Sequence, residues 1–346
     1  MNSCTISKTR MEERGPEMSE PADILAALRD CRTVLISVHK NPDGDALGSQ
    51  LGLMMALEKA GKKVFAHNLD PVPEIYRFLP WSSRITTGPR VNGTFDAFLV
   101  LDADPARTGL FNGSWPARTL INIDHHVTNR AEWPITWLDP NATATGEMIY
   151  RLLKGLGIPM DKDMALCLYT AIFTDTGSFR YSNTTPESMR IAASLIEAGA
   201  DPWLVTENVY ESFSYKRINL LGKVIAGIER SSDGRIAWVL VTDELYRLTG
   251  TTAEDTDNFV NFVRSIKGVE VAVLFRQTGA EQYKISLRAK GRVDLSGLAV
   301  TLGGGGHKNA AGGVLDGTFP AVRDKVIAAV GRELDAQLGK RTVPAP

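Results

Sequence analysis

Three side chains that can bind a metal ion lie within seven residues in the sequence SVHKNPDGDALGS, positions 37–49. They are His39, Asp43 and Asp45, and they follow directly on the apolar run TVLISV. A run of β-branched and aliphatic residues without polar alternation is typical of a strand that is buried on both faces. The sequence therefore predicts a buried strand whose carboxyl end is followed by a histidine and two carboxylates.

Three further segments place acids and histidines at comparable positions. They are Asp102 and Asp104 after AFLVL (97–101), Asp124, His125 and His126 after TLINI (119–123), and Asp175 in LCLYTAIFTDTG (166–177). In an open parallel sheet, the polar loops at the carboxyl ends of the strands meet at one edge. Carboxylates gathered there repel one another unless cations lie between them, so the pattern predicts bound divalent metal.

The ligand types restrict the choice of metal. Mixed carboxylate and imidazole ligands favour manganese, with magnesium, cobalt or iron as substitutes, and the lack of thiolate ligands disfavours structural zinc. A pair of ions about 3.5–4 Å apart requires one bridging carboxylate and outer ligands on each side. Asp102 is our candidate for the bridge. The remaining ligands divide into His39 and Asp43 for one Mn²⁺ ion, and Asp45, His125 and Asp175 for the other.

We assign catalytic roles to Asp102 and His126. Successive side chains in an extended segment point in opposite directions, so His126 is not expected to share the task of His125. We expect His126 to face the substrate phosphate or to support a ligand from behind, and it could assist proton transfer to the leaving group. Two bound ions would lower the pKa of a bridging water for attack in line with the leaving group.

Some of these residues have simpler interpretations that stay open. A single aspartate after a strand is often a helix cap or a turn residue, and this applies to Asp104 and Asp124. The sequence PDGD alone could also form an ordinary turn. His67 lies outside every cluster and is expected to be solvated or hydrogen-bonded locally.

The candidate ligands require a scaffold of alternating strands and helices. Aliphatic residues at helical spacing from Leu47 to Leu57, followed by Gly61, predict a helix that ends before a second strand near Val64. Further helices are expected at about 145–155, 162–174 and 186–198. This alternation predicts an α/β domain with a mainly parallel sheet and helices on both faces.

A second, smaller α/β domain is expected in the C-terminal part. SYKRINLLGKVIAGIER (214–230) has the pattern of one long amphipathic helix, and the strand-like runs RIAWVLVT, VEVAVLFRQ and QYKISLRA follow. The predicted divisions are a flexible leader at 1–21, a catalytic metal-binding domain at 22–200, a linker and connecting helix at 201–230, and a substrate-binding domain at 231–340.

Composition excludes several classes of function. With 346 residues, of which 43% are hydrophobic, the chain can bury two cores. Its formal net charge of −1 disfavours a general binder of long duplex nucleic acid, although Lys and Arg exceed acids by five between positions 264 and 308. Three cysteines without CxxC spacing indicate a reducing compartment, so we expect a cytoplasmic protein. No segment approaches the roughly 18 apolar residues of a membrane span.

A glycine-rich segment, GGGGHKNAAGG, could bind a phosphate or a nucleotide. Glycines let main-chain N–H groups approach an anion closely, and a histidine and a lysine follow them. The candidate residues are Gly304, Gly305, Gly306, His307 and Lys308. Arg288 is a further candidate, with Arg264, because a guanidinium can hold a phosphate through two parallel hydrogen bonds. The segment has neither a P-loop ending nor a GxGxxG context, and a flexible linker is the alternative.

The chain resembles the DHH/DHHA1 phosphoesterase superfamily, in its branch of NrnA-like oligoribonucleases. The matching segments are HKNPDGDALGS, LDADPARTG, NIDHHVTN and FTDTGSFRYSNTT, then VRSIKGVEVAVLFRQ, KISLRAK and GGGGHKNAAGG, over about residues 22–338. The resemblance implies a DHH domain and a DHHA1 domain with the active site in the cleft between them. It also implies manganese-dependent hydrolysis of phosphodiester or phosphomonoester bonds in short nucleotides. Asp104 is not required by the family motif and stays unassigned.

Several substrates remain open within this resemblance. We expect oligoribonucleotides of about two to five nucleotides such as pApA, or the 3'-phosphate of adenosine 3',5'-bisphosphate (pAp), with the second domain holding a neighbouring phosphate and base. The alternatives are a cyclic dinucleotide phosphodiesterase, an inorganic pyrophosphatase, or a nucleotide-binding regulator with an inactive site. The glycine-rich segment disfavours a pyrophosphatase, for which a Lys- and Arg-rich site is expected. The sequence also leaves a homodimer open.

Overall fold

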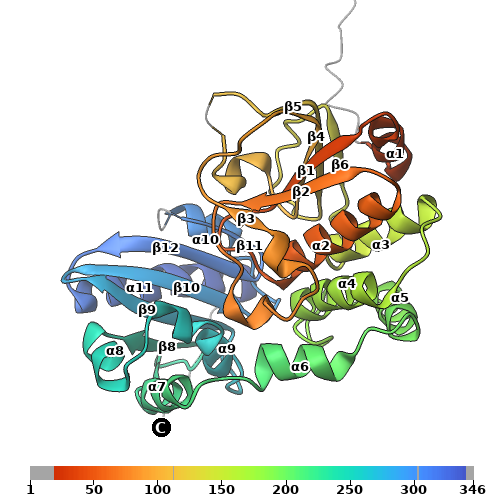
Figure 1. Cartoon of the computed structure of the whole chain (residues 1–346). Coiled ribbons are helices and arrows are strands. Elements are labelled where there is room, and N and C mark those ends of the chain that lie inside the picture. The colour runs from red at the N-terminus through yellow and green to blue at the C-terminus, as the bar shows by residue number, and fades with distance from the viewer. Residues whose placement is uncertain (1–18, 112, 302–303, 340–346) are drawn as a thin grey trace, which may run out of the picture. The chain divides into compact units, whose positions relative to one another are not determined.

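A computed structural model describes residues 19–111, 113–301 and 304–339, except for the side chains of 299–301 and 305–307 (Figure 1). Most of the predicted leader, residues 1–18, therefore lies outside the described residues. The chain forms two compact units, Met1–Ser212 and Phe213–Pro346.

The first unit is built on a six-stranded sheet in the order β3-β2-β1-β4-β5-β6, and all of its paired strands are parallel. The strands are β1 (Thr33–Ser37), β2 (Lys63–Asn68), β3 (Thr86–Thr87), β4 (Phe95–Leu101), β5 (Ala117–Asp124) and β6 (Ile135–Leu138). The prediction of a mainly parallel α/β sheet is confirmed. Because β1, β4 and β5 are neighbours, their carboxyl ends lie next to one another.

Helices connect these strands and pack on one face of the sheet. The cluster on the other face consists of strand and loop residues among those described, so the predicted helices are found on one face and not on both. The α-helices of the first unit are α1 (Pro21–Arg29), α2 (Gly44–Lys59), α3 (Thr145–Gly155), α4 (Lys162–Asp175), α5 (Pro186–Glu197) and α6 (Pro202–Tyr210). Short 3-10 helices are η1 (Glu74–Tyr76), η2 (Ser82–Arg84) and η3 (Pro105–Thr108). α2 packs against both α3 and α4, as Figure 1 shows.

Successive residues of the central strands enter two different cores. Val34 and Ile36 of β1 join the large core with the helices, whereas Leu35 packs in a smaller cluster with Phe98 and Trp133. Each fully buried aliphatic side chain contributes roughly 1.5–3 kcal/mol to folding. The strand that precedes His39 is therefore held firmly from both sides.

Glycines let α2 and α4 approach closely. A Cβ atom at Gly48 would overlap the carbonyl oxygen of Cys167, and one at Gly44 would overlap the side chain of Thr174. Any larger residue would push the two helices apart, since the nearest neighbour at Gly48 is a backbone atom. This contact holds the amino end of α2 against the carboxyl end of α4, where Asp175 is the last residue.

The second unit has a mixed six-stranded sheet in the order β11-β12-β10-β9-β8-β7, in which only the pairing of β8 with β9 is parallel among the described residues. The strands are β7 (Glu229–Arg230), β8 (Ile236–Val241), β9 (Val271–Gly279), β10 (Gln282–Ala289), β11 (Gly305–His307) and β12 (Ala310–Asp316). The helices are α7 (Tyr215–Ala226), α8 (Asp243–Thr249), η4 (Ala253–Thr256), α9 (Phe259–Arg264), α10 (Ser296–Thr301) and α11 (Phe319–Leu338).

Two cores stabilise this second sheet. Val273 and Phe275 of β9 pack with α11 residues such as Val326, while the intervening Leu274 packs with residues of α7 and α9, among them Val224. Helices therefore cover both faces, which fits the predicted smaller α/β domain.

The long helix predicted at 214–230 is wrong at its C-terminal end. α7 ends at Ala226, with Gly227 at its C-cap, and Glu229–Arg230 form β7, which pairs antiparallel with β8. Glycine ends the helix because it lacks the packing and the conformational restriction that favour another helical turn. The amphipathic pattern of the sequence continues beyond Gly227, so it does not indicate where the helix ends.

None of the helices within the described residues combines the length and the apolar character that a membrane span requires.

Candidate metal centre

The structure brings seven of the predicted side chains together at the carboxyl edge of the first sheet. Their potential ligand atoms form three overlapping groups, in each of which all atoms lie within 4.8 Å of one another. The groups are His39 with Asp43 and Asp102, Asp45 with His125 and Asp175, and Asp102 with His125 and His126. No cysteine belongs to these groups, which are drawn from the described residues alone.

Asp102 lies between two histidines. Its Oδ2 atom is 3.5 Å from Nε2 of His39, and its Oδ1 atom is 3.6 Å from Nε2 of His125. The residue has a φ of 59°, which is uncommon for a residue other than glycine, and its side chain is only 2% exposed. The backbone thus directs one buried carboxylate so that each oxygen faces a different histidine, as a bridging ligand requires.

Both histidines are oriented by main-chain carbonyl groups. Nδ1 of His39 lies 2.7 Å from the Lys40 oxygen, and Nδ1 of His125 lies 3.2 Å from the Ala142 oxygen. A carbonyl oxygen only accepts, so each Nδ1 carries the proton of that bond. Nε2 of each ring then carries a lone pair in the neutral state, as metal-binding histidines require.

Helix ends hold the carboxylates of the cluster. Asp43 caps α2 by accepting a hydrogen bond from the Ala46 N–H at 3.0 Å. Asp45 accepts hydrogen bonds from the N–H groups of Thr145 at 2.7 Å and Gly146 at 2.8 Å, at the start of α3. Main-chain N–H groups therefore hold both carboxylates, without positively charged side chains.

The pKa values of the buried carboxylates and of His39 are shifted by burial and by neighbouring charges. Burial, together with the charges of Asp102 and Asp175, raises the pKa of Asp45 well above its ordinary value. Burial also raises the pKa of Asp175 to about 6, with Asp102 adding to the rise and His125 opposing it. Burial lowers the pKa of His39, but its hydrogen bonds to Asp102 and Asp43 outweigh this and raise it to about 11. The cluster therefore favours positive charge, and its oxygen and nitrogen donors fit Mn²⁺, Mg²⁺ or Co²⁺.

His126 is held by the carboxylate that begins its motif. Its Nδ1 atom lies 2.6 Å from Oδ1 of Asp124 and 3.6 Å from Oδ1 of Asp102. Burial lowers the pKa of His126, but the hydrogen bond to Asp124 and the charge of Asp102 raise it to about 9. At this position His126 can donate a hydrogen bond or a proton.

Two residues outside the metal groups have the simple roles that were left open. Asp104 caps η3 by accepting from the Ala106 N–H at 3.0 Å, and its other oxygen accepts from the Arg130 N–H at 3.2 Å. His67 is hydrogen-bonded locally, to Oγ1 of Thr86 and to the oxygen of Gly88, both at 2.9 Å.

Sequence reasoning missed two cations on the loops that carry the candidate ligands. The Lys40 N–H donates to the Arg107 oxygen at 3.1 Å, so the loops after β1 and β4 are joined there. Both side chains are exposed, and the charge of Arg107 acts to lower the pKa of His126. The signal was present in LDADPARTG, where an arginine follows the second acid by three positions.

The predicted substrate residues lie in the second unit. Arg288 and Arg264 are half-buried, and they donate to the oxygens of Leu287 at 3.0 Å and Ala289 at 3.4 Å, so both guanidinium groups lie at the carboxyl end of β10. Gly304 and Lys308 are exposed.

The backbone of the glycine-rich run is partly a strand. Gly305–His307 form β11 and pair with β12, so this part is not a linker. A Cβ atom at Gly304 would overlap the Gly312 backbone, which explains the need for glycine at that position. The side chain of His307 lies outside the described residues.

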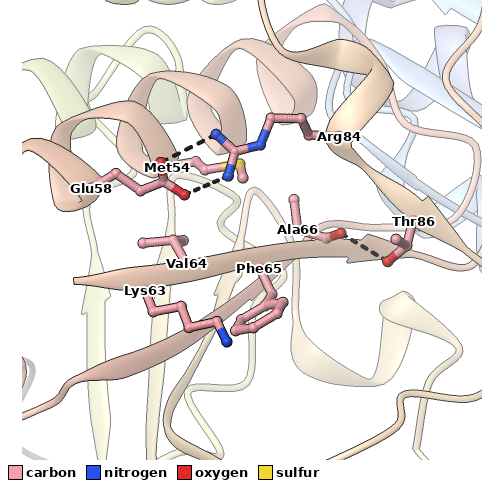
Figure 2. Close-up of a pocket in the computed structure, with 8 residues that line it drawn as sticks. All are labelled: Met54, Glu58, Lys63, Val64, Phe65, Ala66, Arg84 and Thr86. Carbon is pink, nitrogen blue, oxygen red and sulfur yellow. Dashed lines mark hydrogen bonds and ion pairs between the residues drawn. The ribbon is translucent and has the colours of Figure 1, made fainter.

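A separate pocket lies beside the amino half of β2 (Figure 2). Its lining includes Phe65 and the ion pair of Arg84 with Glu58, whose closest atoms are 2.5 Å apart. Lys63, which also lines it, is aligned with Thr33 at the start of β1. No residue of the metal groups lines this pocket.

Comparisons with known proteins match both parts of the chain. Residues 33–172 match the DHH family, N-terminal domain, and residues 234–335 match the DHHA1 domain. The chain is 36% identical over 316 residues to the bifunctional oligoribonuclease and PAP phosphatase NrnA of Thermus thermophilus, covering 90% of this chain and 93% of the relative. It is 30% identical over 287 residues to the Bacillus subtilis protein of the same name, covering 81% and 88%.

A solved structure resembles the whole fold. The exopolyphosphatase-related protein from Bacteroides fragilis superposes with a TM-score of 0.82 at 28% sequence identity. The match covers 91% of this chain and 95% of that chain.

Proposed function

The chain belongs to the DHH family and carries a DHHA1 domain after its DHH domain, and on this premise we propose that it is a manganese-dependent hydrolase of short nucleotides. The proposed substrates are short oligoribonucleotides such as pApA and the 3'-phosphate of pAp. The names of the relatives from Thermus thermophilus and Bacillus subtilis, which state both activities, support this choice. A cytoplasmic location is part of the proposal.

The convergence of three histidines and four aspartates at one sheet edge carries the proposal. Buried carboxylates that raise one another's pKa destabilise the folded chain, so their gathering has to serve a ligand of positive charge. We assign His39 and Asp43 to one ion and Asp45, His125 and Asp175 to the other, with Asp102 shared. When bound, the two ions would supply an activated water and neutralise charge on the phosphate.

The chain's own residues would orient the substrate. His126, held by Asp124, would donate a hydrogen bond to a phosphate oxygen or a proton to the leaving ribose oxygen. Arg107 and Lys40 would attract a second phosphate of the substrate, because both are exposed cations on the loops that carry the ligands. This requirement for a second phosphate would favour pAp and pApA over simple monoesters.

Residues of the second unit would bind the remainder of the nucleotide. Arg264 and Arg288 are the proposed phosphate contacts, and the segment that includes Gly304, Gly305, Gly306, His307 and Lys308 is the proposed site for a neighbouring phosphate or base. Such contacts would hold a short substrate in register and would give long strands no advantage.

The test compares initial rates on pApA, pAp, cyclic di-AMP, pyrophosphate and a long single strand, with manganese present. We expect hydrolysis of pApA or pAp to exceed that of the other three. The variant Asp45→Asn should abolish the activity, whereas His67→Gln, a change of a histidine outside the cluster, should retain it. Faster cleavage of cyclic di-AMP or pyrophosphate would overturn the proposed substrate class.

A further inference from the structure

We propose that Asp124 and Asn129 are positioning residues that fix the ring of His126, so that His126 contacts the substrate through Nε2. The inference rests on the proposed function for the identity of the substrate. It assigns a role to two residues that belong to none of the three potential metal groups.

Asp124 holds both the backbone and the ring of His126. Its Oδ1 atom accepts a hydrogen bond from the His126 N–H at 3.1 Å and lies 2.6 Å from Nδ1 of the same residue. The side chain of Asp124 is fully buried. A buried carboxylate that accepts at this distance requires the proton to be on Nδ1, because an ionised carboxylate has no donor.

Asn129 holds the other side of the same carboxylate. Its Nδ2 atom donates to Oδ2 of Asp124 at 2.6 Å and to Oδ1 of Asn122 at 2.8 Å. Its Oδ1 atom accepts from the Ala131 N–H at 2.9 Å. Both amide hydrogens and the amide oxygen of Asn129 are therefore used, and the amide cannot turn without losing a bond.

Asn122 connects this network to the loop of Asp102. Its Nδ2 atom donates to the oxygens of Val100 at 3.0 Å and Ala103 at 2.8 Å, on the two sides of Asp102. One buried set of amides thus fixes both the left-handed backbone at Asp102 and the ring of His126. Asp124, Asn129 and Asn122 therefore hold both Asp102 and His126, the two side chains to which we assign catalytic roles.

The geometry shows which ring nitrogen of His126 is available to the substrate. His126 belongs to a potential metal group with Asp102 and His125, and its Nδ1 atom lies 3.6 Å from Oδ1 of Asp102. However, Nδ1 is already committed to Asp124, at a distance shorter by 1 Å than that to Asp102. Contact with a substrate oxygen must then be made through Nε2, from which a histidine held at Nδ1 by a carboxylate can donate a proton.

The test uses Asp124→Asn, which preserves shape but removes the charge, and Asn129→Ala, which removes a donor to Asp124. Asn68→Ala is the matched control, because Asn68 is also fully buried in this sheet and, within the described part of the chain, its amide is hydrogen-bonded to the amide of Gln50. We expect kcat on pApA to fall about 10–100-fold in the first two variants, with KM changed less than about threefold and with bound manganese unchanged. Asn68→Ala should keep the parent kcat.

A spectroscopic measurement on metal-free protein does not depend on activity. We expect a downfield Nδ1–H proton resonance of His126, assigned by its loss in His126→Asn, to move upfield in Asp124→Asn and to stay in place in Asn68→Ala. Loss of bound manganese in Asp124→Asn, or an unchanged kcat and resonance, would overturn the inference. If the parent hydrolyses neither pApA nor pAp, the proposed function fails, and the resonance still tests whether Asp124 fixes the ring.

Discussion

Asp102 and His39 approach to 3.5 Å, Oδ2 to Nε2, from the ends of the adjacent parallel strands β4 and β1. The second oxygen of Asp102 lies 3.6 Å from Nε2 of His125 and accepts a hydrogen bond from Oγ1 of Thr145 at 3.1 Å. A single carboxylate is therefore shared between two parts of the cluster, and its removal should affect both.

Replacing Asp102 with Asn should remove metal and activity together. The amide offers one weaker oxygen ligand and no charge, so we expect kcat/KM on pApA to fall by about 100-fold or more and bound manganese to decrease. Asp104→Asn is the control in the same loop, because its amide oxygen can still cap η3. Equal metal content in the Asp102 variant and the parent would remove Asp102 from the ligand set.

Metal binding should release protons and weaken at low pH. In the metal-free protein the pKa of His39 is raised to about 11, so the ring is protonated throughout the neutral range and must lose that proton to bind an ion through Nε2. The apparent affinity for manganese should therefore fall about tenfold for each unit of pH below neutrality, per proton released. Calorimetric titration at pH 7.5 in two buffers of different ionisation enthalpy measures this release. Identical heats in the two buffers would contradict it, and His39→Gln should release one proton fewer.

Gly48→Ala should lower both the stability of the fold and the affinity for manganese, although residue 48 belongs to none of the metal groups. The added methyl group meets the Cys167 carbonyl oxygen, so α2 and α4 must separate, at a cost of roughly 1–3 kcal/mol of unfolding free energy. Manganese affinity should fall as well, since Asp45 and Asp175 are carried by the two helices. Gly222→Ala in α7 is the control, where the methyl group meets open space and should be neutral or stabilising. Denaturant unfolding of both variants checks the difference, and equal stability of Gly48→Ala and the parent would exclude a tight helix contact.

Arg107→Gln should raise the KM of a substrate with two phosphates more than the KM of a substrate with one. We expect KM for pAp to rise about tenfold, the value of one charged hydrogen bond, with little change for a chromogenic diester that has a single phosphate. Arg118→Gln, an exposed arginine at the amino end of β5, should change neither value. Equal effects of Arg107→Gln on the two substrates would contradict a contact with a second phosphate.

The fold and the meeting of the candidate ligands could be predicted because each ligand is adjacent in sequence to a regular element. Asp102 follows a strand of seven residues, and Asp175 ends a helix whose apolar pattern is clear. Periodicity and chain order place such residues at the same edge of a parallel sheet without knowledge of any contact.

Roles that depend on tertiary contacts could not be predicted in this way. The sequence left Asp124 open as a cap or turn residue, whereas the structure shows its bonds to His126 and Asn129. The bond of Thr145 to Asp102 joins residues 43 positions apart, and no local pattern marks it. The end of α7 at Ala226 was missed because the amphipathic pattern continued beyond the glycine that stops the helix.

Diffraction data collected at the manganese absorption edge, from crystals of the protein grown with Mn²⁺, would test the central claim most directly. The account predicts two anomalous peaks on either side of Asp102, one beside His39 and Asp43 and the other beside Asp45, His125 and Asp175. A single peak, or peaks that lie away from these side chains, would contradict it.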